Sequence, residues 1–242
     1  MQILFIRHAD PNYVLDSLTR EGVREARALA EYLEGVKIDR YYCSTLGRAK
    51  KTASYTLRKK GAKAQYYTWL EEFHGRCEKP NRKGTVEYCW DWLPADWTAE
   101  PLFYDKERWF DASAFNGTNV KSEALHVISE FDNLLAAQGY VRDGAIYRAE
   151  KPNTDTIAIF CHLGIQCVFL AHLIGVSPMV LWHGFAQSPS SITKVVTEER
   201  EEGKAYFRIL EMGAVPHLAL KNMKPEFAAR FCEGYSIKEQ RH

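Results

Sequence analysis

The amino-acid sequence predicts an α/β protein, a three-layer α/β/α sandwich with a mainly parallel central sheet and an inserted aromatic-rich lid. Short apolar, β-rich runs alternate with amphipathic segments of about 12 or more residues, which is the pattern of βαβ crossovers. The hydrophobic fraction of 46% is enough for a sizeable core. The stretch 74–118 breaks the alternation, because it holds four of the six tryptophans and shows no clean period.

The first third of the chain alternates strands and helices. Residues 2–7 are apolar and too short for a helix, so they predict a buried strand. Thr19 is an expected N-cap for an amphipathic helix over 20–34, which Gly35 ends. Next we expect a strand over 39–43, a helix over 46–60 ended by Gly61, and a strand over 65–69.

The aromatic stretch 74–118 is predicted to be a lid with short helices, inserted into one domain that spans 1–242. Its tryptophans are expected to form the lid's own core, and its aromatic content is unusual for a disordered segment. Beyond it we expect a helix over 119–139, a strand over 156–161, a helix over 163–174, strands over 191–197 and 205–211 joined by a charged turn over 198–203, and a short surface helix from Lys224.

Composition narrows the function classes. The net charge is +1 and no basic stripe is visible, so no nucleic-acid partner is expected. No apolar run reaches the roughly 18 residues that span a membrane, and no signal peptide is visible. Six cysteines without a C-x-x-C pair predict buried free thiols and a cytoplasmic protein. The oligomeric state stays open, a homodimer included.

Polar residues with phosphate chemistry stand at the ends of predicted strands, where α/β sheets bind ligands. Arg7 presents a planar fork that can bind two phosphate oxygens. The adjacent His8 can attack phosphorus if one ring nitrogen is unprotonated, which requires the other to donate to a backbone carbonyl. Arg48 lies in the first turn of a predicted helix, and His162 follows a predicted strand.

Several other chemistries lack their motifs. There is no G-x-x-x-x-G-K-[ST], no G-x-G-x-x-G after a strand, no G-x-S-x-G and no H-E-x-x-H. We therefore expect no bound cofactor and no metal site.

Five motifs, in this order, resemble those of branch 1 of the histidine phosphatase superfamily, the phosphoglycerate mutase-like branch. They cover residues 1–73 and 154–197. They are Arg7-His8-Ala9-Asp10, Leu18-Thr19-Arg20-Glu21-Gly22, Ser44-Thr45-Leu46-Gly47-Arg48-Ala49-Lys50-Lys51-Thr52-Ala53, Leu70-Glu71-Glu72-Phe73 and Cys161-His162-Leu163-Gly164. Departures from the family pattern are Ala9 and Leu163, where glycine is commoner, and Cys161, where Ser or Thr is usual.

The resemblance implies a phosphohistidine intermediate on His8, in a phosphate pocket that also contains Arg7, Arg48 and His162. Glu72 is then the proton donor and later the base, in preference to Glu71, because it takes the third place of L-x-E. No metal is required, because cationic groups already offset the phosphate charge. The substrate is expected to be a small phosphomonoester, with inorganic phosphate as product. Further candidates for substrate contact are Ser44, which could equally be a helix N-cap, and His74, Arg76 and His183.

Two alternatives remain beside a phosphatase. A phosphoglycerate-type mutase would need additional basic residues in the lid, and it has candidates in Arg76, Lys79, Arg82 and Lys83. A non-catalytic phosphate-binding regulatory module would keep the pocket without turnover, although every expected catalytic group is present.

Overall fold

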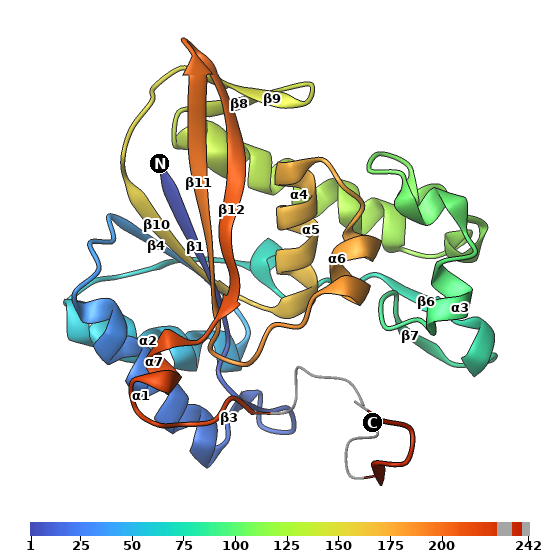
Figure 1. Cartoon of the computed structure of the whole chain (residues 1–242), viewed down its shortest axis with the longest axis horizontal. Coiled ribbons are helices and arrows are strands. Elements are labelled where there is room, and N and C mark those ends of the chain that lie inside the picture. Colours follow the sequence, from blue (N-terminus) through green and yellow to red (C-terminus); the bar gives the residue numbers. More distant parts are fainter. Residues whose placement is uncertain (227–233, 239–242) are drawn as a thin grey trace.

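An eight-stranded sheet forms the centre of the protein in the computed structural model, which describes residues 1–226 and 234–238 (Figure 1). The strands from β5 to β1 pair in parallel, and the remaining four extend the sheet with antiparallel pairing. The predicted α/β fold is confirmed, and its parallel part is the half formed by β5-β4-β10-β1. In spatial order the strands are β5 (Gln65–Tyr67), β4 (Arg40–Ser44), β10 (Thr156–Cys161), β1 (Gln2–Arg7), β11 (Ile192–Glu201), β12 (Lys204–Ala214), β9 (Ile146–Ala149) and β8 (Tyr140–Asp143).

Helices cover both faces of the sheet and complete the three predicted layers (Figure 1). Side chains alternate along β1, so that Ile3 and Phe5 join one apolar cluster while Leu4 and Ile6 join the other. The first cluster includes side chains of two long helices, α4 (Val120–Ala137) and α5 (Leu163–Ile174). The second includes side chains of α1 (Arg20–Glu34) and α2 (Gly47–Lys60).

The register of the parallel strands brings the predicted site residues to one edge. Arg7 at the end of β1 pairs with Cys161 at the end of β10, and Phe160 pairs with Cys43 near the end of β4. The residues that follow these strands therefore emerge side by side, at the edge where α/β sheets bind ligands.

The antiparallel half differs from the sequence prediction in two ways. The hairpin β8–β9 was not expected, since its short, polar strands carry a weak pattern. The charged turn predicted over 198–203 is wrong, because β11 continues to Glu201 and β12 begins at Lys204. Glu198 bonds to Arg200, Tyr206 and Arg208 on this exposed ribbon, so cross-strand charge pairing supports strand where the charges suggested a turn.

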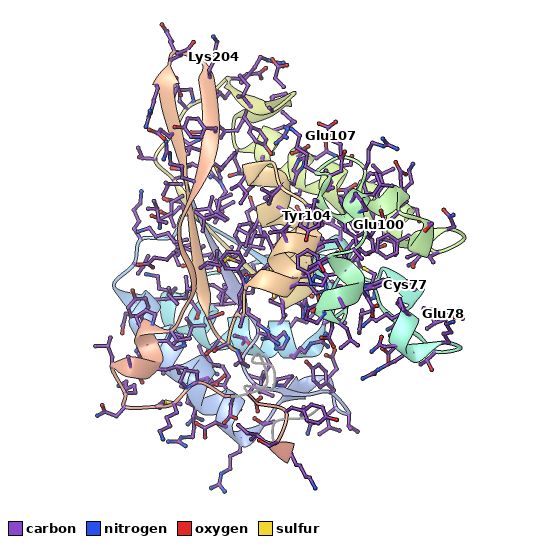
Figure 2. The ribbon with its side chains drawn as sticks, turned by 45° about the vertical axis from the view of Figure 1, so that its right-hand side comes forward. Cys77, Glu78, Glu100, Tyr104, Glu107 and Lys204 are labelled. Carbon is purple, nitrogen blue, oxygen red and sulfur yellow. The ribbon has the colours of Figure 1, made fainter. Side chains whose placement is uncertain are left out.

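The 74–118 segment contains a small hairpin and several short helical turns instead of one regular element. It comprises β6 (Arg76–Glu78), β7 (Val86–Tyr88), α3 (Pro94–Trp97) and 3₁₀ turns over Pro80–Arg82, Pro101–Tyr104, Trp109–Asp111 and Ser113–Phe115. Its buried rings form edge-to-face contacts with one another and with Trp182 of α6 (Pro178–Gly184). Figure 2 shows its labelled residues Cys77, Glu100 and Tyr104 far from Lys204 at the tip of the β11–β12 hairpin.

The predictions for the cysteines and for the C-terminal helix can be tested only in part. Five cysteines are buried and free, as predicted, and Cys232 lies outside the described residues. Most of the surface helix predicted from Lys224 also lies outside them. Within the described ranges, no helix combines the length and apolar character needed to cross a bilayer. Three smaller elements complete the described fold, namely the β2–β3 pair (Pro11–Asn12 and Ser17–Leu18), a 3₁₀ turn over Thr68–Leu70 and α7 (Pro216–Ala219). The 3₁₀ turn takes the place of the end of the strand predicted over 65–69, because β5 ends at Tyr67.

Candidate active site

His8 directly follows β1 and is almost completely buried. Its Nδ1 lies 2.8 Å from the carbonyl oxygen of Ala9. A carbonyl only accepts hydrogen bonds, so Nδ1 carries the proton and Nε2 keeps its lone pair. Burial and the neighbouring charge of Arg7 place the pKa of His8 well below its ordinary value. The imidazole is therefore neutral and in the tautomer that a nucleophile requires.

His162 faces His8 from the N-terminus of α5. The two ring centroids are 5.1 Å apart, which is close enough for both imidazoles to contact one phosphoryl group. His162 Nε2 lies 2.8 Å from the hydroxyl of Ser44, and this hydroxyl also accepts the N–H of Leu46 at 3.2 Å. Ser44 thus connects the end of β4 to His162. Burial and His8 hold the pKa of His162 well below its ordinary value.

Arg7 and Arg48 are both buried, with 4% and 9% of each residue exposed. Arg7 donates from Nη1 to the carbonyl of Gln187, and Arg48 donates from Nη1 to Asp16 at 2.7 Å. Both Nε atoms are buried and have no hydrogen-bond partner among the described residues. Buried donors are normally satisfied, so these two N–H groups point to an anion as their partner.

Glu72 is the carboxyl at the centre of the site. Its Oε1 accepts the N–H of Phe73 at 2.9 Å and the N–H of Ile165 at 3.0 Å, which leaves Oε2 to carry a proton. Burial raises the pKa of Glu72 in spite of these two donors. Glu71 instead accepts from the hydroxyl of Thr45 and lies 3.4 Å from His74. Of the two carboxyls, Glu72 has the environment of a general acid.

The 74–118 segment reaches the site through Trp90. A Cβ added to Gly164 would lie 2.7 Å from Glu72 Oε1 and 2.7 Å from the Trp90 ring, so the carboxyl and the indole both pack against this glycine. Trp90 is stacked on Tyr88, with centroids 4.6 Å apart, and also contacts Trp182 at 5.5 Å. Trp90 therefore lies beside the Glu72 carboxyl, and both residues are partly exposed.

The remaining predicted substrate residues lie at different depths. His74 is exposed, and its Nε2 lies 3.4 Å from Glu71. The exposed Arg76 places its guanidinium 4.2 Å from the centroid of the Tyr88 ring. Protein groups engage both ring nitrogens of His183, which attaches the 74–118 segment to α6: Nδ1 donates to the Met179 carbonyl, and Nε2 accepts the N–H of Trp92.

Sequence reasoning missed the residues that hold the site in place. Thr52 accepts the N–H of Ala9 at 3.0 Å and donates to the Arg48 carbonyl. Asp16 binds Arg48, and Gln187 binds Arg7 through its carbonyl. Apart from the Thr52 bond to the Arg48 carbonyl within α2, these contacts join segments far apart in the chain, so local sequence patterns do not reveal them.

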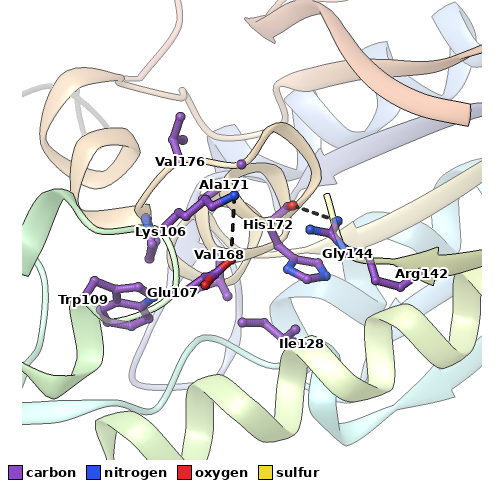
Figure 3. A pocket seen from close by; sticks show the side chains of 12 residues that line it. Lys106, Glu107, Trp109, Ile128, Arg142, Gly144, Val168, Ala171, His172 and Val176 are labelled. Atoms are coloured by element: carbon purple, nitrogen blue, oxygen red, sulfur yellow. Dashed lines mark hydrogen bonds and ion pairs between the residues drawn. The ribbon is translucent and has the colours of Figure 1, made fainter. Parts of the chain in front are cut away.

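A separate cavity of about 230 Å³ lies between the 74–118 segment and α5 (Figure 3). Its lining includes none of the residues of the phosphate pocket. Lys106 pairs with Glu107 at 3.7 Å, and Arg142 donates to the carbonyl of His172. The imidazole of His172 lies 2.9 Å from Asp132, so this histidine has a structural partner. Lys106, Arg142 and His172 are therefore all engaged by other protein groups.

Comparison with known proteins agrees with the geometry of the site. Residues 3–114 match the family model described as histidine phosphatase superfamily (branch 1). The adenosylcobalamin/alpha-ribazole phosphatase of Escherichia coli (strain K12) is 25% identical over 193 residues, which cover 76% of this chain and 84% of that protein.

Solved structures show the same fold at lower identity. A mutant phosphoserine phosphatase from Entamoeba histolytica in complex with phosphoserine superposes with a TM-score of 0.59 and 16% identity, covering 90% of this chain and 98% of its own. A mycobacterial glucosyl-3-phosphoglycerate phosphatase in complex with VO3 gives a TM-score of 0.56 and 16% identity, covering 88% and 98%. The likeness extends over nearly the whole chain, including the strands that follow the family match.

Proposed function

Because residues 3–114 identify this chain as a member of the histidine phosphatase superfamily (branch 1), we propose that it hydrolyses a small phosphomonoester through a phosphohistidine intermediate on His8. One observation carries the proposal. Two neutral imidazoles and two buried guanidinium groups converge at the carboxyl ends of β1, β4 and β10, and the His8 tautomer leaves Nε2 free to attack.

In the first step, Nε2 of His8 forms a bond to phosphorus and the bond from phosphorus to the leaving oxygen breaks. Arg7, Arg48 and His162 bind the three remaining phosphoryl oxygens and stabilise the charge in the transition state. The proton on Oε2 of Glu72 passes to the leaving oxygen, which departs as an alcohol. The raised pKa of Glu72 supports this role, because an ordinary glutamate would be ionised near neutral pH.

In the second step, a water molecule attacks phosphorus while Glu72, now ionised, takes the water's proton. The new phosphorus–oxygen bond forms, the phosphorus–nitrogen bond breaks, and inorganic phosphate leaves together with the neutral His8. Glu72 is protonated again at the end, so the cycle closes without a cofactor.

Two of the four basic residues that a mutase could use, Lys79 and Arg82, are already paired with a carboxylate. A mutase needs free cations for a second phosphate, but Lys79 and Arg82 both pair with Glu87, at 3.7 Å and 2.7 Å. Lys79 also donates to the Asp91 carbonyl. These two side chains stabilise the small hairpin, which leaves Arg76 and Lys83 as the cations that a mutase could use for a second phosphate.

The decisive experiment compares the wild type with His8→Ala over a broad panel of phosphomonoesters. We expect His8→Ala to lose at least about 10³-fold in kcat/KM, because binding groups cannot replace a nucleophile. His126→Ala, which removes an exposed histidine on α4, serves as the matched control and should retain normal turnover. A His8→Ala protein that retains near-normal turnover would exclude this mechanism.

A second experiment separates turnover from mere phosphate binding. Rapid quenching of the wild type with a radiolabelled substrate should trap acid-labile phosphate on the protein, and His8→Ala should trap none. A regulatory module would bind phosphate without forming this species. A mutase would return the label to an isomer of the substrate instead of releasing it as inorganic phosphate.

A further inference from the structure

We propose that Asp16 is a positioning residue for Arg48, holding the guanidinium by Nη1 so that its other N–H groups are directed to the phosphoryl group. The inference rests on the phosphatase function proposed above and adds a residue that none of the family motifs contains. Asp16 lies in the short loop between β2 and β3, 32 residues before Arg48 in the chain.

The Asp16 carboxylate makes a compact set of contacts with the start of α2. Oδ1 lies 2.7 Å from Arg48 Nη1, and Oδ2 accepts the N–H of Gly47 at 2.5 Å. Burial alone would raise the pKa of Asp16, but the Gly47 N–H and the Arg48 guanidinium outweigh it and lower that pKa. The carboxylate is therefore charged throughout the neutral range and binds Arg48 as an ion pair.

The backbone is shaped to make this contact. Asp16 has φ of 41°, a left-handed conformation that costs free energy for a residue other than glycine and persists where the surroundings enforce it. A Cβ on Gly47 would lie 2.0 Å from the Asp16 carbonyl oxygen, so only glycine allows the loop to come this close to α2.

The two pocket arginines are held in the same way by different groups. Each uses Nη1 for a protein oxygen and keeps a buried Nε without a partner in the described part of the chain. For Arg7 the oxygen is the Gln187 carbonyl, which no substitution removes, whereas for Arg48 it is a side chain. Holding one end of a guanidinium preorganises the other end for bidentate binding of an anion.

A purely structural role is the alternative. Leu46, the N-cap of α2, has no side chain that caps the helix, and Asp16 supplies a cap from another segment. A missing cap lowers the free energy of unfolding but leaves phosphate binding by the folded protein unchanged. Loss of a negative charge alone would strengthen the binding of phosphate, whereas loss of positioning would weaken it. The direction of the change therefore separates these roles.

The test is calorimetric titration of inorganic phosphate into the wild type, Asp16→Ala, Asp16→Asn, Arg48→Ala and the Asp16→Ala/Arg48→Ala double variant. We expect Asp16→Ala to weaken phosphate binding about tenfold. Asp16→Asn should weaken it less, because its single amide oxygen can still accept from Arg48 Nη1, although its NH2 group cannot accept the N–H of Gly47. In the Arg48→Ala background, Asp16→Ala should change the affinity less than twofold, since there is no guanidinium left to position.

Asp155→Ala is the matched control, because Asp155 pairs with Arg40 at 2.9 Å at the opposite end of the strands. Unchanged or tighter phosphate binding by folded Asp16→Ala would overturn the proposal, as would an equal loss in both backgrounds. Phosphate binding needs no turnover, so this outcome is distinct from a failure of the phosphatase proposal, which the His8→Ala panel tests. Circular dichroism establishes that each variant is folded before titration. If Asp16→Ala does not fold, Asp16→Gly replaces it with the same expected loss, because glycine lacks the carboxylate and adopts the left-handed φ of 41° at this position without strain.

Discussion

Gly164→Ala is a one-methyl substitution that tests the contact between the 74–118 segment and the general acid. Gly164 is the second residue of α5, and an added Cβ would meet Glu72 Oε1 at 2.7 Å and the Trp90 ring at 2.7 Å and 2.9 Å. These distances are shorter than van der Waals contact. Neither neighbour can move freely, because two backbone N–H groups hold the carboxylate and Tyr88 stacks on the indole.

The expected magnitude follows from two opposing terms. Overpacking costs about 1–3 kcal/mol in the free energy of unfolding, while replacing glycine by alanine in a helix returns roughly 0.5–1 kcal/mol. The net loss of stability is therefore about 0–2.5 kcal/mol, and the protein remains folded. The catalytic effect is larger, since displacement of a general acid by about 1 Å costs on the order of 100-fold in kcat.

The assay compares an alkyl phosphomonoester with 4-nitrophenyl phosphate. An alkoxide is a poor leaving group and departs only when Glu72 protonates it, whereas nitrophenolate departs without protonation. The kcat should therefore fall on the order of 100-fold for the alkyl ester and much less for the aryl ester. Gly184→Ala is the control, because no atom lies within 4 Å of its added Cβ. If Gly164→Ala turns over the alkyl ester as fast as Gly184→Ala does, the placement of Glu72 against α5 is refuted.

Three further predictions concern pH and stability. The lowered pKa of His8 keeps the imidazole neutral at pH values where an ordinary histidine would be protonated, and activity falls as the pH rises through the raised pKa of Glu72. In a pH profile of kcat/KM, Glu72→Gln should therefore lack the fall in activity at high pH. A Glu72→Gln profile that keeps this fall would contradict the assignment of Glu72 as the acid. Burial raises the pKa of Glu25 from 4.5 to about 7, so the folded state binds this proton more tightly and unfolding becomes easier by roughly 3 kcal/mol between pH 4.5 and 7. Glu25→Gln should remove most of this dependence in urea titrations at pH 5 and pH 8, and an unchanged dependence would refute it. Thr52→Val leaves the buried N–H of Ala9 without an acceptor and should cost about 1–3 kcal/mol, measured against the wild type by urea unfolding; a loss below roughly 0.5 kcal/mol would count against that bond.

Local patterns were enough to predict the parallel half of the fold. The strand over 2–7 and the helices over 20–34 and 163–174 carry clear sequence patterns, and the structure places them at the predicted bounds. The β11–β12 hairpin was predicted too short, because its charges are balanced by partners on the opposite strand that a one-dimensional pattern does not pair.

Some residues of the candidate site could likewise be predicted from local patterns, and others could not. His8, His162 and Arg48 were predictable because each stands at the end of a strand or the start of a helix, where chemistry in this fold class gathers. Asp16 and Trp90 were not singled out, because a loop aspartate and one tryptophan among four look ordinary until the tertiary structure brings them against α2 and α5.

The pairing of β1 has a consequence for biosynthesis. β1 is synthesised before both strands that flank it in the sheet, because β10 and β11 begin only at Thr156 and Ile192. An apolar strand with two open edges therefore waits for most of the chain to be made before it is paired. We expect chains terminated before β11 to aggregate, because β1 then lacks its partner along one edge.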